Sequence, residues 1–375
     1  MTARSRLVSS CVLATCLALV SCSGDSGPKP ADAGVPDASN QPVVGGKLGV
    51  AIASAAAAGT GSAKAKSADP NEPPESGIFA EGEADKRQPR GGPPKVDVLS
   101  DGVEPRVQLA NKLDAAETKT SVTVGMRMGQ GVRLPTVTFE LSIKPEKAKG
   151  DKAAEEKDAA GPAHVAATVT GVSVSPSQPV PKEMGDAIAK LKGTVLRWDQ
   201  TAEGVVTAQA TELPKDAGEG LELIVDSLAD TVGTMIAPVP SKPVGKDAYW
   251  IVGDRAKTAV GVDVVRFRVF KVLGIENGQV TLSVDVRQYA ADKTLKLDGG
   301  GGQKQEMVME LFDSQGKGTL VWKAESFVPV RGDVKVGLGA RLAGGPPGGR
   351  GGPVVQTELT GAIAPPASAT PDKKP

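Results

Sequence analysis

Four stretches of the chain alternate apolar and polar residues with a period of two. In 280–287 the apolar residues Val280, Leu282, Val284 and Val286 are separated by polar ones, and 121–128, 137–143 and 334–342 follow the same pattern. Because successive side chains of a β-strand point to opposite faces, this spacing predicts antiparallel strands that bury one face only.

The same alternation predicts the side of the sheet on which two arginines of a further strand lie. Arg266 and Arg268 alternate with Phe267 and Val269. We therefore expect the two arginines on an outward, polar face of the sheet.

Turn and helix signals complete the predicted fold. Asn277-Gly278 lies between two apolar runs and predicts a tight hairpin, since both positions favour positive φ. In 181–191 and 219–236 the apolar residues recur at helical spacing, which predicts two amphipathic helices that pack on the sheet. The predicted fold class is α+β, dominated by antiparallel β-sheet, with two or three helices packed on one face.

Composition divides the chain into a tether, a domain and a tail. Pro and Gly occupy 22 of the 73 positions in 23–95, a share typical of aperiodic low-complexity sequence, for which ~25–30% is the usual threshold. We expect 22–95 to be a disordered tether with a reach of roughly 45 Å. The β-rich domain is expected to span 96–365, followed by a disordered tail over 366–375.

Two short segments of the expected domain are similar in sequence, which raises the question of an internal duplication. Gly193-Thr194 and Gly318-Thr319 are each followed by aliphatic residues and a Trp, and each comes after a pair of alternating stretches. This similarity favours an internal duplication with halves 96–237 and 238–365. The matching stretch is six residues long, so chance similarity is the alternative.

Ile78 and Phe79 are two large apolar residues within the expected tether. Such a pair can form a docking segment that packs on the folded domain or on a partner. The alternative is that both are exposed residues of a disordered chain.

The amino terminus has the features of a secretory signal peptide. Arg4 and Arg6 provide positive charge, and 7–21 contains no charged residue. This uncharged run is too short for a bilayer, which needs about 20 helical residues. We expect residues 1–21 to be removed on export.

The end of this segment, Leu19-Val20-Ser21-Cys22, resembles the lipobox of bacterial lipoproteins. The resemblance implies cleavage before Cys22 and a diacylglyceryl thioether on its sulfur, which anchors the chain to a membrane. Cys11 and Cys16 leave with the signal peptide, so Cys22 is the single thiol of the mature chain. Ser23, rather than Asp, follows the Cys, which favours the outer membrane over the inner one.

Few residue patterns indicate catalysis, a metal or a cofactor. The chain has one His, His164, next to Pro162 at the start of an expected strand, and the mature chain has no further Cys. We therefore expect an idle, solvent-exposed His164 and no catalytic residue, metal site or cofactor. Lys plus Arg and Asp plus Glu number 44 each, and this balance argues against nucleic acid as a partner.

Asp247 and Asp254 are the best candidates for a carboxylate pair, because they flank Tyr249-Trp250 in an aromatic-poor chain. Tyr249 and Trp250 themselves form either a binding lip or part of a core strand that begins after a Pro/Gly loop.

The order of segments resembles a group of uncharacterised secreted bacterial lipoproteins. The similarity is clearest at Gly193–Gly204 and at Pro238–Trp250, and it is weaker at Phe267–Val286. It implies a membrane-anchored envelope protein and brings no known activity, catalytic residue or cofactor.

We expect a non-enzymatic binding or structural module for an apolar ligand or an envelope protein; the alternative is a carboxylate-dependent hydrolase of the cell envelope. Complete burial of the apolar stripe of helix 219–236 would argue against a lipid groove, and hydrolysis requires two carboxylates that face each other in a cleft.

Overall fold

The computed structural model describes most of the chain after residue 72. The described residues are 73–110, 117–129, 131–146, 163–178, 180–201, 204–218, 220–236, 238–299, 303–324, 326–344 and 352–366. Two compact units are present: the smaller comprises Met1–Glu72 and Thr294–Met307, and the larger comprises Pro73–Lys293 and Val308–Pro375. The expected signal peptide, Cys22, the start of the tether and residues 367–375 lie outside the described residues.

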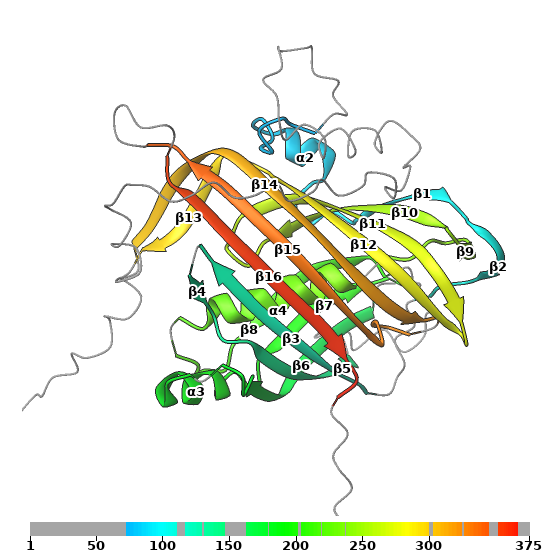
Figure 1. Ribbon diagram of the computed structural model, residues 1–375, viewed down its shortest axis with the longest axis horizontal. Helices are drawn as coiled ribbons and strands as arrows, with labels where there is room; N and C mark the ends of the chain where they lie inside the picture. Colours follow the sequence, from blue (N-terminus) through cyan, green and yellow to red (C-terminus); the bar gives the residue numbers. More distant parts are fainter. Residues whose placement is uncertain are drawn as a thin grey trace, which may run out of the picture. The chain divides into compact units, whose positions relative to one another are not determined.

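Twelve strands follow one another in one antiparallel sheet (Figure 1), and all belong to the larger unit except the first residues of β14, up to Met307. Their order is β1-β10-β11-β12-β14-β15-β16-β3-β5-β6-β7-β8, while β4 pairs with β3 and β2 pairs with β9. The strand bounds are β1 (Lys95–Ser100), β2 (Val103–Val107), β3 (Thr118–Met128), β4 (Val132–Arg133), β5 (Val137–Pro145), β6 (Ala163–Val174), β7 (Val195–Gln200), β8 (Val206–Glu212), β9 (Val244–Lys246), β10 (Tyr249–Lys257), β11 (Asp263–Glu276), β12 (Gln279–Ala290), β14 (Gln303–Lys323), β15 (Arg331–Leu342) and β16 (Val354–Ala364). The smaller unit contains β13 (Thr294–Gly299).

The structure confirms the predicted fold class, which is α+β with a dominant antiparallel sheet. The predicted hairpin is also present. Asn277 and Gly278 have φ values of 51° and 73°, and Glu276 pairs with Gln279 across the turn. Positive φ at both central positions is what a two-residue hairpin turn requires.

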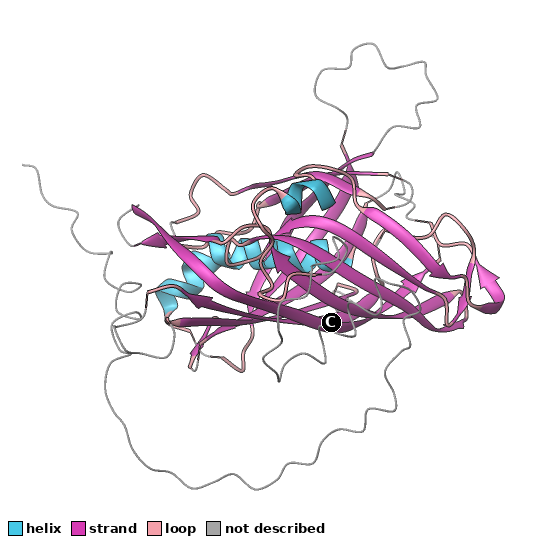
Figure 2. Ribbon diagram, turned by 90° about the horizontal axis from the view of Figure 1, so that it is seen from above, coloured by secondary structure: helices cyan, strands magenta, loops and turns pink. Residues whose placement is uncertain are grey.

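Three helices accompany the sheet in the described residues: α2 (Glu83–Arg87), α3 (Lys182–Ala189) and α4 (Glu222–Met235). The two helices predicted from the sequence are α3 and α4, which pack on the same core. In Figure 1 and in the view turned by 90° (Figure 2), α4 lies among the strands, and it packs against β3, β15 and β16. Ala84 of α2 belongs to a separate apolar cluster.

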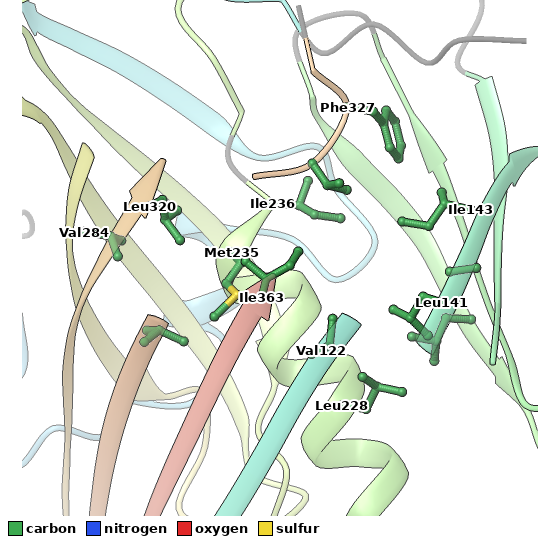
Figure 3. Packing of buried hydrophobic residues seen from close by; sticks show 14 of the residues in the cluster. Val122, Leu141, Ile143, Leu228, Met235, Ile236, Val284, Leu320, Phe327 and Ile363 are labelled. Carbon is green, nitrogen blue, oxygen red and sulfur yellow. The ribbon is translucent and has the colours of Figure 1, made fainter. Parts of the chain in front are cut away.

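The main core forms where α4 meets the sheet (Figure 3). Leu228 and Met235 of α4 are 0% and 1% exposed and lie beside apolar residues of β3, β5 and β16. The helix approaches β16 closely, because a Cβ on Gly361 would lie 2.3 Å from Thr231 Cγ2. Glycine at 361 therefore permits α4 to pack closely on β16, and a larger residue there would displace the helix.

Residues 73–94, here named the N-terminal strap, belong to the larger unit. The ordered region thus begins before residue 96, where composition places the domain boundary. Ile78 forms a parallel bridge with Ala290, and Phe79 is 3% exposed. The Phe79 ring packs edge-on against Tyr289, with centroids 5.9 Å apart. One buried aromatic residue and a few backbone hydrogen bonds fix a segment whose Pro/Gly content favours disorder.

The two similar Gly-Thr segments occupy different places in the fold. Gly193 and Thr194 precede β7, whereas Gly318 and Thr319 lie inside β14. Apart from β1, the strands of each expected half lie side by side in the sheet order, first β10–β12 and β14–β16 and then β3 and β5–β8. Because β16 pairs with β3, the halves 96–237 and 238–365 share one continuous sheet, and their duplication stays a prediction.

Candidate functional site

The face of β11 that packs on the core carries two arginines. Val264, Arg266, Arg268, Phe270 and Val272 alternate along the strand and are each at most 4% exposed. The expectation that Arg266 and Arg268 face outward is therefore wrong. Their neighbours on the opposite face are apolar as well, so alternation alone did not identify the buried face.

The arginines face inward because they satisfy the carboxyl end of α4. The last carbonyls of a helix have no partner within the helix, and α4 has no basic residue in its last turn. Arg268 Nη1 donates to the carbonyl oxygens of Gly233, Thr234 and Ile236 at 2.8, 3.2 and 2.7 Å. A cation at this end also complements the helix dipole.

Asp254 of β10 neutralises part of this charge. It lies directly opposite Arg266 in the strand register and accepts two hydrogen bonds from it, from Nε at 3.0 Å and from Nη2 at 2.7 Å. Its Oδ2 also accepts from Arg268 Nη2 at 3.0 Å. One carboxylate is thus shared by two guanidinium groups, and the first pair has the bidentate geometry of strong ion pairs.

Asp230 of α4 supplies a second carboxylate. Its Oδ1 lies 3.5 Å from Arg266 Nη1, and its Oδ2 accepts the backbone N–H of Ala259 at 3.1 Å. We name Asp230, Asp254, Arg266 and Arg268 the Arg–Asp cluster.

Burial and charge act differently on each member of the cluster. Burial raises the pKa of Asp230 despite the nearby Arg266. Burial opposes ionisation of Asp254 too, but Arg266 and Arg268 together hold its pKa below the usual value. Burial lowers the pKa of Arg268 to about 10 against the attraction of Asp254. The pKa of Arg266 is raised instead, because burial is outweighed by two carboxylates, Asp254 and Asp230.

Arg268 keeps one hydrogen-bond donor without a partner. Its side chain is 2% exposed, and among the described residues no acceptor bonds to Nε. A guanidinium has five N–H donors, and an unpaired buried one is energetically costly.

A pocket of about 300 Å³ lies beside the cluster, near the lower end of the ~300–1,000 Å³ common for ligand sites. Its lining comes from β8, the carboxyl end of α4, β10, β11 and the N-terminal strap. The polar lining residues are Thr207, Gln209, Asp254, Arg255, Arg266 and Arg268.

Arg255 connects the pocket wall to the N-terminal strap. Its side chain is 6% exposed and binds both carboxylate oxygens of Asp263, from Nε at 2.6 Å and from Nη2 at 3.0 Å. Nη1 donates to the carbonyl of Gln88 at 3.4 Å and lies 3.3 Å from Asp85 Oδ1. These contacts hold the strap against the rim of the pocket.

The two residues proposed as a binding lip lie in different environments. Trp250 is 0% exposed, stacks on Phe270 with centroids 5.4 Å apart, and donates from Nε1 to Pro238 O at 3.0 Å. Tyr249 is only partly buried. Trp250 is therefore a core residue of β10, which matches the alternative reading of this segment.

The polar candidates from the sequence are not brought together. Asp254 is buried in the cluster, whereas Asp247 is exposed and pairs with Lys271 at 3.1 Å. His164 is largely exposed and its Nδ1 lies 2.6 Å from Asp199 Oδ1 on the adjacent strand. It therefore has a carboxylate partner that the sequence did not indicate.

The apolar space beside α4 is nearly filled. Between the end of the helix and β3, β5, β6 and β7 it measures about 10 Å³, which is about the minimum for one water molecule. The apolar stripe of α4 is buried, with Leu221, Ile224, Val225 and Leu228 at most 8% exposed. This space does not hold a lipid chain.

Comparison of the sequence with protein-family models and with curated proteins gives no significant match. Within the described part of the chain, no helix is both long and apolar enough to cross a membrane. The same residues contain no group of three or more His, Cys, Asp or Glu side chains that could hold a metal ion.

Proposed function

We propose that this chain is a lipoprotein of the bacterial cell envelope, anchored through Cys22, whose β-rich domain is a non-enzymatic module that binds a small polar ligand. The observation that carries the binding proposal is the pocket beside the Arg–Asp cluster. Its charged wall is held in place by backbone carbonyls of α4 and by Asp254. Such a preorganised polar wall can bind a ligand without rearranging first.

The lining residues favour binding over hydrolysis. Among the described lining residues Asp254 is the single carboxylate, and both of its oxygens accept hydrogen bonds from guanidinium groups. Hydrolysis by carboxylates usually needs a pair, one of which exchanges a proton with the substrate. Asp230 is not in the lining, so the pocket offers no such pair in the described residues.

The volumes of the two cavities favour a polar ligand over an apolar one. The charged pocket has about 300 Å³ available, whereas the apolar space beside α4 has about 10 Å³. A lipid chain would have to displace α4, whose buried stripe forms much of the core. A polar molecule can enter the charged pocket with the helix in place.

Native mass spectrometry of the full-length protein, extracted from bacterial membranes in mild detergent, tests the binding proposal. We expect one small molecule per chain in the wild type, released on unfolding. Thr207→Trp should lose it, because an indole on β8 fills the pocket from its rim. Thr211→Trp is the matched control, since Thr211 lies on the same strand outside the lining. Equal amounts of bound molecule in the two variants, or none in the wild type, would refute the proposal.

Labelling with palmitate tests the anchor. The wild type is expected to incorporate the label and to remain with the membrane fraction, because two or three acyl chains bind a bilayer almost irreversibly. Cys22→Ala should lose both properties. Label that persists in this variant would refute the assignment of Cys22.

A further inference from the structure

We infer that the ligand of this pocket is an oxyanion: a small molecule whose carboxylate or phosphate group binds at Arg268. The inference rests on the proposed binding function and specifies the chemistry of the ligand.

The pocket wall has more positive than negative charge. Arg266 and Arg268 both line it, and the carboxylate they share there is Asp254. Asp230 contacts Arg266 but does not line the pocket. Arg255, the third lining arginine, is matched by Asp263. Asp230 balances the cluster only when ionised, and burial raises its pKa. In the lining itself Arg266 and Arg268 face one carboxylate, so an anion in the pocket would meet more guanidinium than carboxylate groups.

One buried donor of Arg268 is left without an acceptor in the described part of the chain. Nη1 is used by three carbonyl oxygens, and Nη2 donates to Asp254. Nε is buried without a partner among the described residues. A carboxylate or phosphate oxygen is the acceptor that guanidinium N–H groups bind most strongly.

Neutral donors at the rim add to the site. Thr207 and Gln209 of β8 line the pocket, and the side-chain nitrogen of Gln209 lies close to Gly233, next to the Arg266 guanidinium. A hydroxyl and an amide can bind further oxygens of a phosphate or polar atoms of a carboxylate-bearing ligand. The lining therefore combines charged guanidinium groups with neutral hydroxyl and amide groups.

Isothermal titration calorimetry of the full-length protein in detergent, at low salt, tests the inference. The probes are inorganic phosphate, succinate and the neutral sugar glucose. We expect one site for phosphate or succinate and none for glucose, and the stronger of the two anions identifies the ligand class. Arg268→Lys removes Nε and should weaken binding by about tenfold or more, because a charge-assisted hydrogen bond is lost.

Two further variants keep the test decisive if Arg268→Lys folds poorly. Thr207→Trp should abolish anion binding, whereas Thr211→Trp should leave it unchanged, and circular dichroism establishes that both are folded. Absence of binding by both anions would overturn the inference, as would equal binding in Thr207→Trp and the wild type. If native mass spectrometry nevertheless finds a bound neutral molecule, the binding function stands and only the anionic class fails.

Discussion

Replacement of Asp254 by asparagine is expected to lower the free energy of unfolding by about 3–5 kcal/mol. Asp254 is the carboxylate shared by Arg266 and Arg268, which are 4% and 2% exposed. Without it, two buried guanidinium groups lose their common counterion while water remains excluded. Urea unfolding followed by circular dichroism, with linear extrapolation, measures the loss.

The matched control is Asp247→Asn. Asp247 also pairs with a cation, Lys271 at 3.1 Å, but its side chain is 56% exposed. An exposed ion pair contributes ~0–1 kcal/mol, and asparagine tolerates the positive φ of 63° at this position. Equal losses in the two variants would mean that burial of the Asp254 pair has no energetic consequence.

Trp250→Ala is expected to lower the free energy of unfolding by about 3–5 kcal/mol, as is usual when a buried tryptophan is removed. The indole is fully buried, stacks on Phe270 and donates a hydrogen bond to Pro238. Its removal leaves a cavity and an unpaired carbonyl oxygen. The same urea titration measures the effect.

The neighbouring residue provides the control for Trp250. Tyr249 is partly exposed, and Tyr249→Ala should cost about 1 kcal/mol, the average for single substitutions. Trp250→Phe should fall between the two, since it keeps an aromatic ring but loses the donor to Pro238. A Trp250→Ala variant as stable as the wild type would mean that Trp250 is a surface lip after all.

The regular parts of the fold could be predicted from the sequence because local patterns determine them. Alternating runs identified β3, β5, β12 and β15, and helical spacing identified α3 and α4. Asn277-Gly278 identified the β11–β12 hairpin, since few other dipeptides accept positive φ at both positions. Each of these signals lies within a few neighbouring residues.

The inward orientation of Arg266 and Arg268 could not be predicted in this way. The face of β11 opposite the arginines is apolar at Val265, Phe267 and Val269, so polarity did not mark the solvent side. The deciding partner is the carboxyl end of α4, 32 to 35 residues earlier in the chain. A usable signal did exist: α4 has no basic residue in its last turn, so its carbonyls needed donors from elsewhere.

The pocket was beyond sequence reasoning for the same reason. Its lining residues come from five separate parts of the chain: 91–94, 204–209, 233–236 with Pro238, 254–255, and 266 with 268. None of these segments carries a recognisable motif, and β8 lies near the opposite end of the sheet order from β10 and β11, although all three strands line the pocket. The contact between the rings of Phe79 and Tyr289 likewise joins two segments that are far apart in the sequence.

The ¹H–¹⁵N spectrum of the arginine Nε–H groups, recorded on the full-length protein during titration with inorganic phosphate and succinate, tests the anion site most directly. The Arg268 signal is assigned by its loss in Arg268→Lys. We predict that this signal shifts and saturates with one of the anions, while that of Arg197, whose Nε is bonded to Glu146 at 2.9 Å, stays in place. An Arg268 signal that does not move with either anion would contradict the assignment of this pocket.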